Sequence, residues 1–384
     1  MSAVGGAAGG GAAGGGPEAG AGGAAAQGPV GDLIDRCQTI ICCGSGGVGK
    51  TTAAAAIALG AAEKGKRACV VTIDPAKRLA DALGLKSLTN SPSAVSGEWP
   101  GELWAMMLDT KTTFDELVRA YSATPEQAES ILSNRLYRNL SQALSGTQEY
   151  MAMEKLYELH ESGRFDLVVV DTPPTRNALD FLEAPRRLIR FLDNRIFRLL
   201  VMPTRAYLRA VSMATQTFMR SLSRVVGTEV VDDAVAFFQA FEGMEDGFRS
   251  RAASVQNLLT EEGTAFVVVA SPRQDAVEEA LFFVDKLHES GLDVSALVVN
   301  RLHPRFRSGS TATRRRPRGT GGAGAAALAD NLSQLETVAA REESHFAELA
   351  QKVAPAPVAR VPFLSVDVHD VSGLEHIGRH LFAA

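Results

Sequence analysis

The run from Thr39 to Thr52, TIICCGSGGVGKTT, constrains this chain more than any other stretch. Ile40 to Cys43 form a short apolar run, and an alanine-rich segment from Thr52 to Lys64 follows the glycine-rich middle. This order predicts a buried strand, a loop and a helix that stops at Gly65. Because glycines lack a Cβ atom, such a loop can adopt positive φ and bring its backbone N–H groups against an anion. The glycines concerned are Gly44, Gly46, Gly47 and Gly49.

Four of these positions, Gly44, Gly49, Lys50 and Thr51, fit G-x-x-x-x-G-K-[ST], the phosphate-cradling P-loop. In that motif Lys50 provides a cation for the β- and γ-phosphates and Thr51 offers a hydroxyl to Mg²⁺. The positive N-terminal end of the following helix also faces the anion. A ligand-free glycine turn is disfavoured because both flanks fit. We expect ATP and Mg²⁺ as cofactors, bound by Gly44, Ser45, Gly46, Gly47, Val48, Gly49, Lys50, Thr51 and Thr52.

Two aspartates stand where predicted strands end. The strand Ala68 to Asp74 finishes on a carboxylate before Pro75, and in the segment DLVVVDTPPT three valines run into Asp171. Sheets of the α/β class bind ligands at the carboxyl ends of their strands. Asp171 fits a Walker B carboxylate that holds magnesium, usually through water. The alternative for Asp171 is an ordinary turn aspartate. We expect Thr51, Asp74 and Asp171 to surround the metal.

The remaining pattern predicts an α/β fold, a mostly parallel sheet with helices on both faces, as in P-loop NTPases. Apolar segments read as strands alternate with segments of helical character. Residues 110–160 and 180–260 are expected to form an α-helical subdomain. The whole of 30–384 is read as one ATPase domain, behind a disordered Gly/Ala-rich tail at 1–29 and with a flexible linker at 303–327. The further strands are 103–109, 265–271, 296–300 and 358–361, and the further helices 274–290 and 328–352.

Composition excludes several classes of protein. A net charge of −5 over 384 residues gives no reason to expect nucleic acid as a partner. No apolar stretch reaches the ~20 residues of a membrane helix, and the tail lacks the features of a secretory signal. The cysteines form no C-x-x-C pair and are read as small buried hydrophobes in a reducing cytosol. We therefore expect a cytoplasmic protein, with peripheral membrane association left open. The cysteines are Cys37, Cys42, Cys43 and Cys69.

Three motifs, at 44–52, 73–77 and 171–175, resemble the P-loop, switch I and switch II of the ArsA-type family. That family comprises arsenite-pump ATPases and the targeting ATPases for tail-anchored membrane proteins. The segments VVNR at 298–301 and VPFL at 361–364 are similar to its adenine-binding strand end and A-loop.

The resemblance implies a dimeric ATPase. In it, Asp74 would orient or deprotonate the attacking water, and Asp171 would be the Walker B and switch II aspartate. Asn300, Pro362 and Phe363 would hold the adenine ring. The residue pattern alone singles out both aspartates but not Asn300.

The chain departs from the family pattern at Ser45, where the family has a lysine that reaches the partner's phosphates across the dimer. A cation delivered in trans can contribute ~10³ to 10⁵ in phosphoryl-transfer rate. The missing charge could be replaced in two ways. One is a cis cation from Lys77 or Arg176, and the other is a paralogous subunit that keeps the lysine. We favour the heterodimer. Switch II also continues Arg176-Asn-Ala instead of the usual Gly-His-Thr, and the family's zinc and arsenite cysteines are absent.

Residues 180–260 contain apolar side chains at helical spacing, including Met213 and Met219. They read either as core helices or as an adaptable groove for a hydrophobic protein or lipid-like client. Two functions stay open, an ATPase that handles a hydrophobic or anionic client and a regulatory ATP-binding subunit with weak activity alone. A surface-partitioning ATPase of the MinD or ParA type is disfavoured by the large helical insert and by the lack of a terminal amphipathic anchor.

Overall fold

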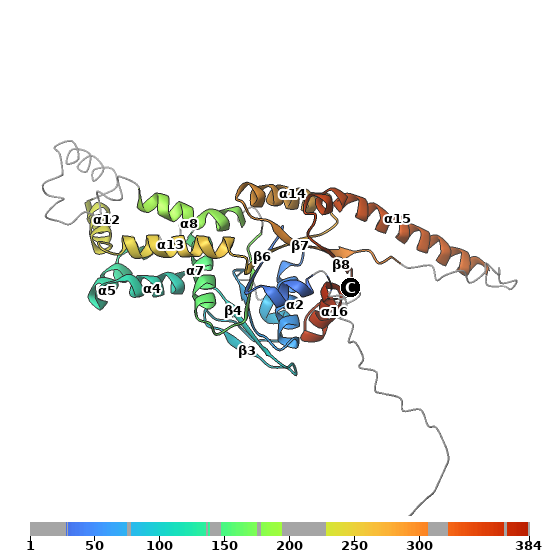
Figure 1. Ribbon diagram of the computed structural model, residues 1–384, viewed down its shortest axis with the longest axis horizontal. Helices are drawn as coiled ribbons and strands as arrows, with labels where there is room; N and C mark the ends of the chain where they lie inside the picture. The colour runs from blue at the N-terminus through green and yellow to red at the C-terminus, as the bar shows by residue number, and fades with distance from the viewer. Residues whose placement is uncertain are drawn as a thin grey trace, which may run out of the picture.

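The computed structural model describes residues 28, 30–74, 78–135, 137–138, 147–174, 178–193, 228–305, 322–364 and 367–382. Within them an eight-stranded sheet forms the centre of the molecule, in the order β3-β4-β2-β5-β1-β6-β7-β8 (Figure 1). All neighbours are parallel except β3 and β4. The predicted α/β fold is confirmed. The strands are β1 Thr39–Cys43, β2 Arg67–Thr72, β3 Ser93–Val95, β4 Glu102–Met107, β5 Leu167–Asp171, β6 Thr264–Ala270, β7 Val294–Leu302 and β8 Val358–Pro362.

The central strands are buried on both faces, which explains their continuous apolar runs. β1 reads TIICC and β5 reads LVVVD, and every residue in both is buried. β-branched side chains pack well on such a pleated surface. Because successive side chains point to opposite faces, Ile40 and Ile41 belong to two different cores. The four cysteines are buried with free thiols, as expected of small hydrophobes.

Each face of the sheet has its own helical layer. One core joins the sheet to helices α1, α2, α3 and α16, and the other joins it to α4, α7, α13, α14 and α15. The first layer comprises α1 Gly31–Arg36, α2 Lys50–Glu63, α3 Arg78–Ala82 and α16 Val371–Phe382. The second comprises α4 Thr110–Tyr121, α7 Thr147–Glu161, α13 Glu245–Thr260, α14 Gln274–Glu289 and α15 Gly322–Lys352.

Helices α4, α5 (Pro125–Ser133), α7, α8 (Ala178–Leu192), α12 (Thr228–Ala240) and α13 gather at one end of the molecule (Figure 1). Their inner faces bury an aromatic cluster, with Phe248 5.1 Å from Tyr121 and 5.5 Å from Phe241 between ring centroids. Such pairs add to simple area burial. The described helices thus use their apolar faces as core. Met213 and Met219, on which the client-groove prediction rests, lie outside the described residues.

Some element boundaries differ from the sequence-based expectation. α15 begins at Gly322, inside the segment 303–327 that composition suggested to be a linker. Alanine has the highest helix propensity, so the run GAGAAA at 322–327 can extend a helix as readily as a linker. His303 is also held, because its Nδ1 lies 2.6 Å from Glu342 Oε1. Gly28, in the predicted tail, donates to the Phe382 carbonyl. β3, α1, α3 and α16 were not predicted.

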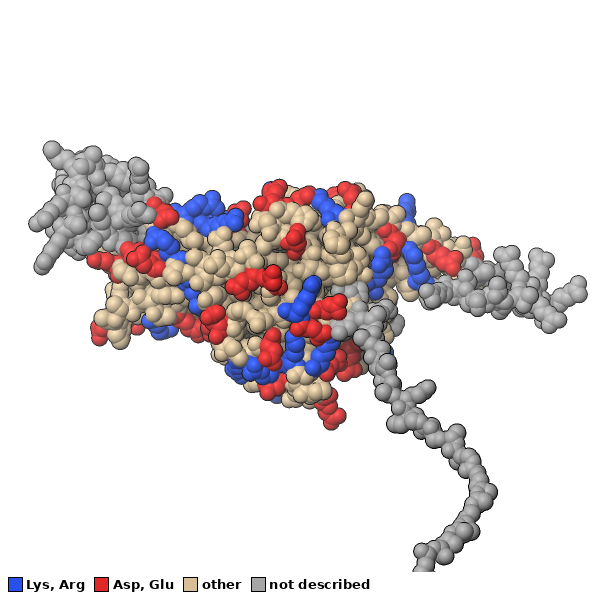
Figure 2. Space-filling model, viewed as in Figure 1, with Lys and Arg blue, Asp and Glu red and all other residues tan. Residues whose placement is uncertain are grey.

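None of the described helices combines the length and the hydrophobicity that a membrane span requires. On the face shown in Figure 2, basic and acidic side chains are interspersed over the described surface.

Helix α2 meets the C-terminal helix α16 at a glycine. A Cβ atom on Gly60 would lie 2.3 Å from Cε2 of the Phe382 ring, which packs there as part of the core around α2. Gly60→Ala should therefore gain helix propensity, about 1 kcal/mol, but lose more through the clash, about 1 to 3 kcal/mol. In a Phe382→Ala background the same substitution should instead stabilise the fold.

Urea denaturation of the four proteins in this double-mutant cycle measures both effects. An equal effect of Gly60→Ala in the two backgrounds would show that the helices do not meet at this point.

Candidate nucleotide-binding site

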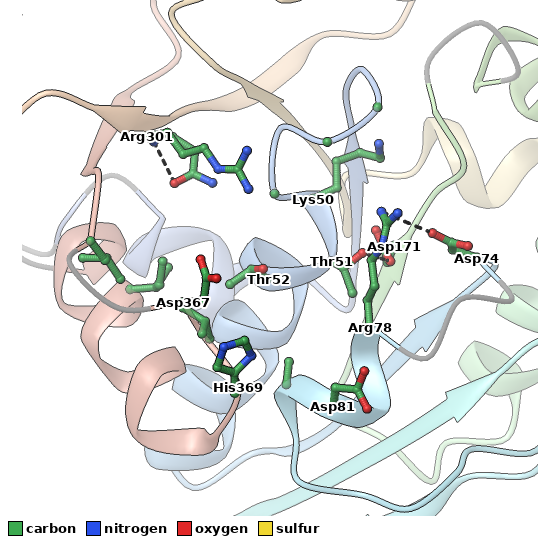
Figure 3. A pocket seen from close by; sticks show the side chains of 18 of the residues that line it. Lys50, Thr51, Thr52, Asp74, Arg78, Asp81, Asp171, Arg301, Asp367 and His369 are labelled. Atoms are coloured by element: carbon green, nitrogen blue, oxygen red, sulfur yellow. Dashed lines mark hydrogen bonds and ion pairs between the residues drawn. The ribbon is translucent and has the colours of Figure 1, made fainter.

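A cavity of about 510 Å³ opens at the carboxyl ends of β1, β2, β5, β7 and β8. Its volume lies in the range of small-molecule sites. It contains charged groups of both signs, several of which point into it in Figure 3. Its lining residues are Gly46, Gly47, Gly49, Lys50, Thr51, Thr52, Asp74, Arg78, Asp81, Ala82, Asp171, Thr172, Pro174, Asn300, Arg301, Pro362, Phe363, Leu364, Asp367, Val368, His369 and Ile377.

The loop between β1 and α2 needs glycine at two close approaches. A Cβ atom on Gly44 would lie 2.0 Å from the Val269 carbonyl oxygen of β6. Gly49 has φ +96°, and a Cβ atom there would lie 2.2 Å from Asn300 Nδ2. The loop is therefore held between β6 and the end of β7, with its backbone turned toward the cavity. Any side chain at Gly44 or Gly49 would displace it.

Lys50 is the first residue of α2 and is only 7% exposed. Its Nζ donates to the Ser45 carbonyl at 2.9 Å, so that the ammonium lies along the loop. Burial lowers the pKa of Lys50, and the nearby Asp171 carboxylate opposes that shift. This is the position in which a cation can meet a phosphate chain that the loop holds.

Asp171, the last residue of β5, is the centre of a buried hydroxyl cluster. Its Oδ2 accepts from Thr51 Oγ1 at 2.7 Å and from Thr72 Oγ1 at 2.9 Å. Among the described residues its buried Oδ1 has no partner. Burial raises the pKa of Asp171, while the two hydroxyls and Lys50 hold it down.

These donors fit magnesium. A hard cation prefers carboxylate and hydroxyl oxygens, and Thr51 and Asp171 present both, one oxygen of Asp171 being without a partner. No group of three or more His, Cys, Asp or Glu side chains in the described part of the chain could hold a metal alone. Mg²⁺ suits such a sparse site because it is usually held by one or two carboxylates together with substrate phosphates and water.

Asp74 follows β2 at the same edge of the sheet. Its backbone N–H donates to Thr72 Oγ1 at 3.2 Å, and its Oδ2 lies 3.7 Å from Arg78 NH1. Thr72 thus joins the backbone of Asp74 to the carboxylate of Asp171 and holds the ends of β2 and β5 together. The sequence-based candidates for a cis cation, Lys77 and Arg176, lie outside the described residues.

At the other end of the cavity the P-loop meets Asn300. Asn300 Nδ2 donates to the Val48 carbonyl at 2.8 Å, and its Oδ1 accepts from the backbone of Arg301 at 2.9 Å. Phe363 follows β8 and is 61% exposed, an unusual state for a phenylalanine beside a cavity. An exposed ring here offers a stacking surface for a planar ligand.

Most predicted site residues line this cavity, but Gly44, Ser45 and Val48 do not. Ser45 is 5% exposed and contributes its carbonyl to Lys50. Sequence reasoning missed Arg78, Asp81, Arg301, Asp367 and His369 among others. Arg78 follows the Asp-Pro-Ala motif closely, and Asp367 and His369 follow the last predicted strand. Nearness to a motif was the only signal for these residues.

A family model described as "Anion-transporting ATPase" matches residues 37–316. The chain belongs to the anion-transporting ATPase family. The resemblance found in the motifs is thereby confirmed, and the predicted enzyme class, an ATPase, agrees with the family.

Three relatives of this ATPase family member are about equally similar to it. The chain is 27% identical to "ATPase ASNA1 homolog" of Babesia bovis over 265 residues, 69% of this chain and 66% of the relative. It is 27% identical to "ATPase GET3" of Malassezia globosa over 264 residues, which are 68% of this chain and 72% of the relative. It is 30% identical to "Uncharacterized protein SCO2128" of Streptomyces coelicolor over 268 residues, which are 70% of this chain and 63% of the relative. The first and third alignments span slightly less than two thirds of the relative.

Asp171 Oδ1, which has no partner in the described part of the chain, leads to a prediction about metal dependence. In the unmodified chain, Mg²⁺ should strengthen ATP binding at least tenfold, because the metal would link Asp171 and Thr51 to the phosphates. Asp171→Asn should remove this gain, since an amide replaces the anionic ligand. Titration calorimetry in MgCl₂ and in EDTA measures the ratio of the two ATP affinities.

Asp81→Asn is the matched control, because Asp81 is an exposed carboxylate of the same cavity. This substitution should leave the ratio of the ATP affinities with and without Mg²⁺ unchanged. A magnesium effect that persists in Asp171→Asn would place the metal elsewhere.

Proposed function

We propose that the chain is a dimeric ATPase that binds Mg-ATP in this cavity and uses hydrolysis to control its helical subdomain. One observation carries the proposal. A single cavity is lined by Lys50, Thr51, Asp74 and Asp171. Thr72 Oγ1 donates to the Asp171 carboxylate and accepts from the backbone N–H of Asp74. A cation, a hydroxyl and two carboxylates at the end of a glycine loop are the groups that phosphoryl transfer requires.

Each residue has a role that follows from its place. Lys50 would bind the β- and γ-phosphates, and Thr51 and Asp171 would hold Mg²⁺. The metal, when bound, neutralises charge that develops on the phosphates. Asp74 would accept a hydrogen bond from the attacking water and orient it. Phe363 would stack on the adenine, with Asn300 and Pro362 bordering the same end of the cavity.

The connection to the helical subdomain runs through β5. Asp171 ends β5, and the next described helix, α8, begins at Ala178. α8 packs against α7 and α13. A change at Asp171 on hydrolysis would therefore be transmitted to α8, as expected of a switch segment that follows a Walker B carboxylate. The client would be hydrophobic or anionic, and the segment 180–260 would provide its binding surface from a cytoplasmic or peripheral membrane position.

Ser45 favours a second candidate within this proposal, a regulatory subunit of a heterodimer. In a two-fold homodimer serine would stand at both trans positions, because the same surface meets its copy. A serine hydroxyl can donate a hydrogen bond but cannot neutralise a transferring phosphate. A paralogue with lysine at this position would supply the charge. A MinD- or ParA-like role is less favoured, because surface partitioning does not require a large helical subdomain.

Lys50→Ala tests the nucleotide site. It removes the buried cation, so ATP affinity measured by calorimetry should fall at least tenfold while the circular dichroism spectrum stays the same. Lys64→Ala is the control, because Lys64 lies at the other end of the same helix and pairs with Asp35. Undiminished affinity in Lys50→Ala would exclude the P-loop as the site.

A mixing experiment tests the heterodimer. The purified chain should hydrolyse ATP slowly and become at least tenfold faster when a lysine-bearing paralogue is added, because the missing charge arrives in trans. The paralogue with that lysine replaced by alanine should bring no gain. Full activity of a homodimer, unchanged on mixing, would exclude the paired subunit.

A further inference from the structure

Among the described residues, few cations lie at the γ-phosphate end of the cavity. Lys50 is engaged with the loop carbonyl of Ser45, and the side chain at position 45 is an uncharged serine. Asp74 and Asp171 place two carboxylates at the same end. A phosphate chain brings further negative charge to this point, so that further positive charge is needed there for hydrolysis.

Arg78 is a cation in the described part of the chain that meets this need. It begins α3, it lines the same cavity as Lys50, and its NH1 lies 3.7 Å from Asp74 Oδ2. Figure 3 shows its guanidinium reaching from α3 to Asp74. The charge is therefore already beside the carboxylate that would orient the attacking water.

The pair between Arg78 and Asp74 is weak. At 3.7 Å the two atoms are beyond hydrogen-bonding distance, and the Arg78 side chain is 67% exposed. Exposed ion pairs contribute only ~0 to 1 kcal/mol. A guanidinium binds phosphate through two parallel N–H donors, which is stronger than such a contact. Arg78 can therefore exchange Asp74 for a phosphate at little cost.

We propose that Arg78 binds the γ-phosphate of ATP in cis and supplies part of the positive charge at this end of the cavity, beside any lysine that a partner adds in trans. This inference rests on the proposed function. In the reaction, the water oxygen bonds to the γ-phosphorus while the bond to the β–γ bridging oxygen breaks. ADP keeps that electron pair, and the water proton leaves through Asp74. Arg78 stabilises the charge on the transferred group.

The test compares ATP with ADP, because only ATP carries the γ-phosphate. Calorimetry with Mg²⁺ gives both affinities for each variant. In Arg78→Ala, ATP binding should weaken about tenfold or more while ADP binding stays the same, since a hydrogen bond to a charged group contributes ~1.5 to 3 kcal/mol. Arg78→Lys should recover part of the preference, because lysine keeps the charge but not the paired donors.

Arg67→Ala is the matched control. Arg67 is also an exposed arginine paired with an aspartate, Asp166, but it lies at the opposite end of β2, so the ratio should not change. Equal weakening of ATP and ADP in Arg78→Ala would show a structural role and overturn the proposal. So would a preference for ATP that survives the substitution. If the unmodified chain binds neither nucleotide, the proposed function itself fails.

Discussion

The site depends on one buried carboxylate, Asp171, and on the two hydroxyls that donate to it. Thr51 comes from the helix after β1, Thr72 ends β2, and Asp171 ends β5, which lies between those two strands in the sheet. Burial raises the pKa of Asp171, so the fold bears a cost for keeping it charged. Both hydroxyls reach the same oxygen. The arrangement leaves the other oxygen for a ligand, and a site of this kind gives up stability for function.

The same carboxylate shows what the sequence could predict and what it could not. The sequence predicts four site residues, because each lies in a short motif that can be recognised from its neighbours in the chain. They are Lys50, Thr51, Asp74 and Asp171. The order β2-β5-β1 and the role of Thr72 depend on which strands pair, and the local pattern does not contain that information. Asn300 came from the family resemblance alone. In the structure its amide donates to the Val48 carbonyl of the P-loop, and its contact with the adenine ring stays a prediction.

Elements that depend on distant partners were the ones missed. α16 packs on Gly60 through Phe382. β3 has only three residues and pairs antiparallel with β4 at the sheet edge. Arg78 was missed for the same reason, because only the fold brings its side chain to the cavity where Asp74 lies. Conversely, the segment 303–327, which composition predicts to be a linker, overlaps the start of α15 at Gly322, because the alanines of that run favour a helix.

The chain path determines how the proposed change at the phosphates would reach the helical subdomain. α7 leads into β5 and α13 leads into β6, so both neighbours of the P-loop strand β1 are continuous with helices of that subdomain. α7 and α13 are also joined by an ion pair, Arg251 to Glu154 at 2.6 Å, in which Glu154 is almost fully buried. Separating a buried pair is costly, so these two helices should move together. α8 follows Asp171 instead of preceding it, and the contact of α8 with α7 and α13 is therefore the surface at which relative movement is expected.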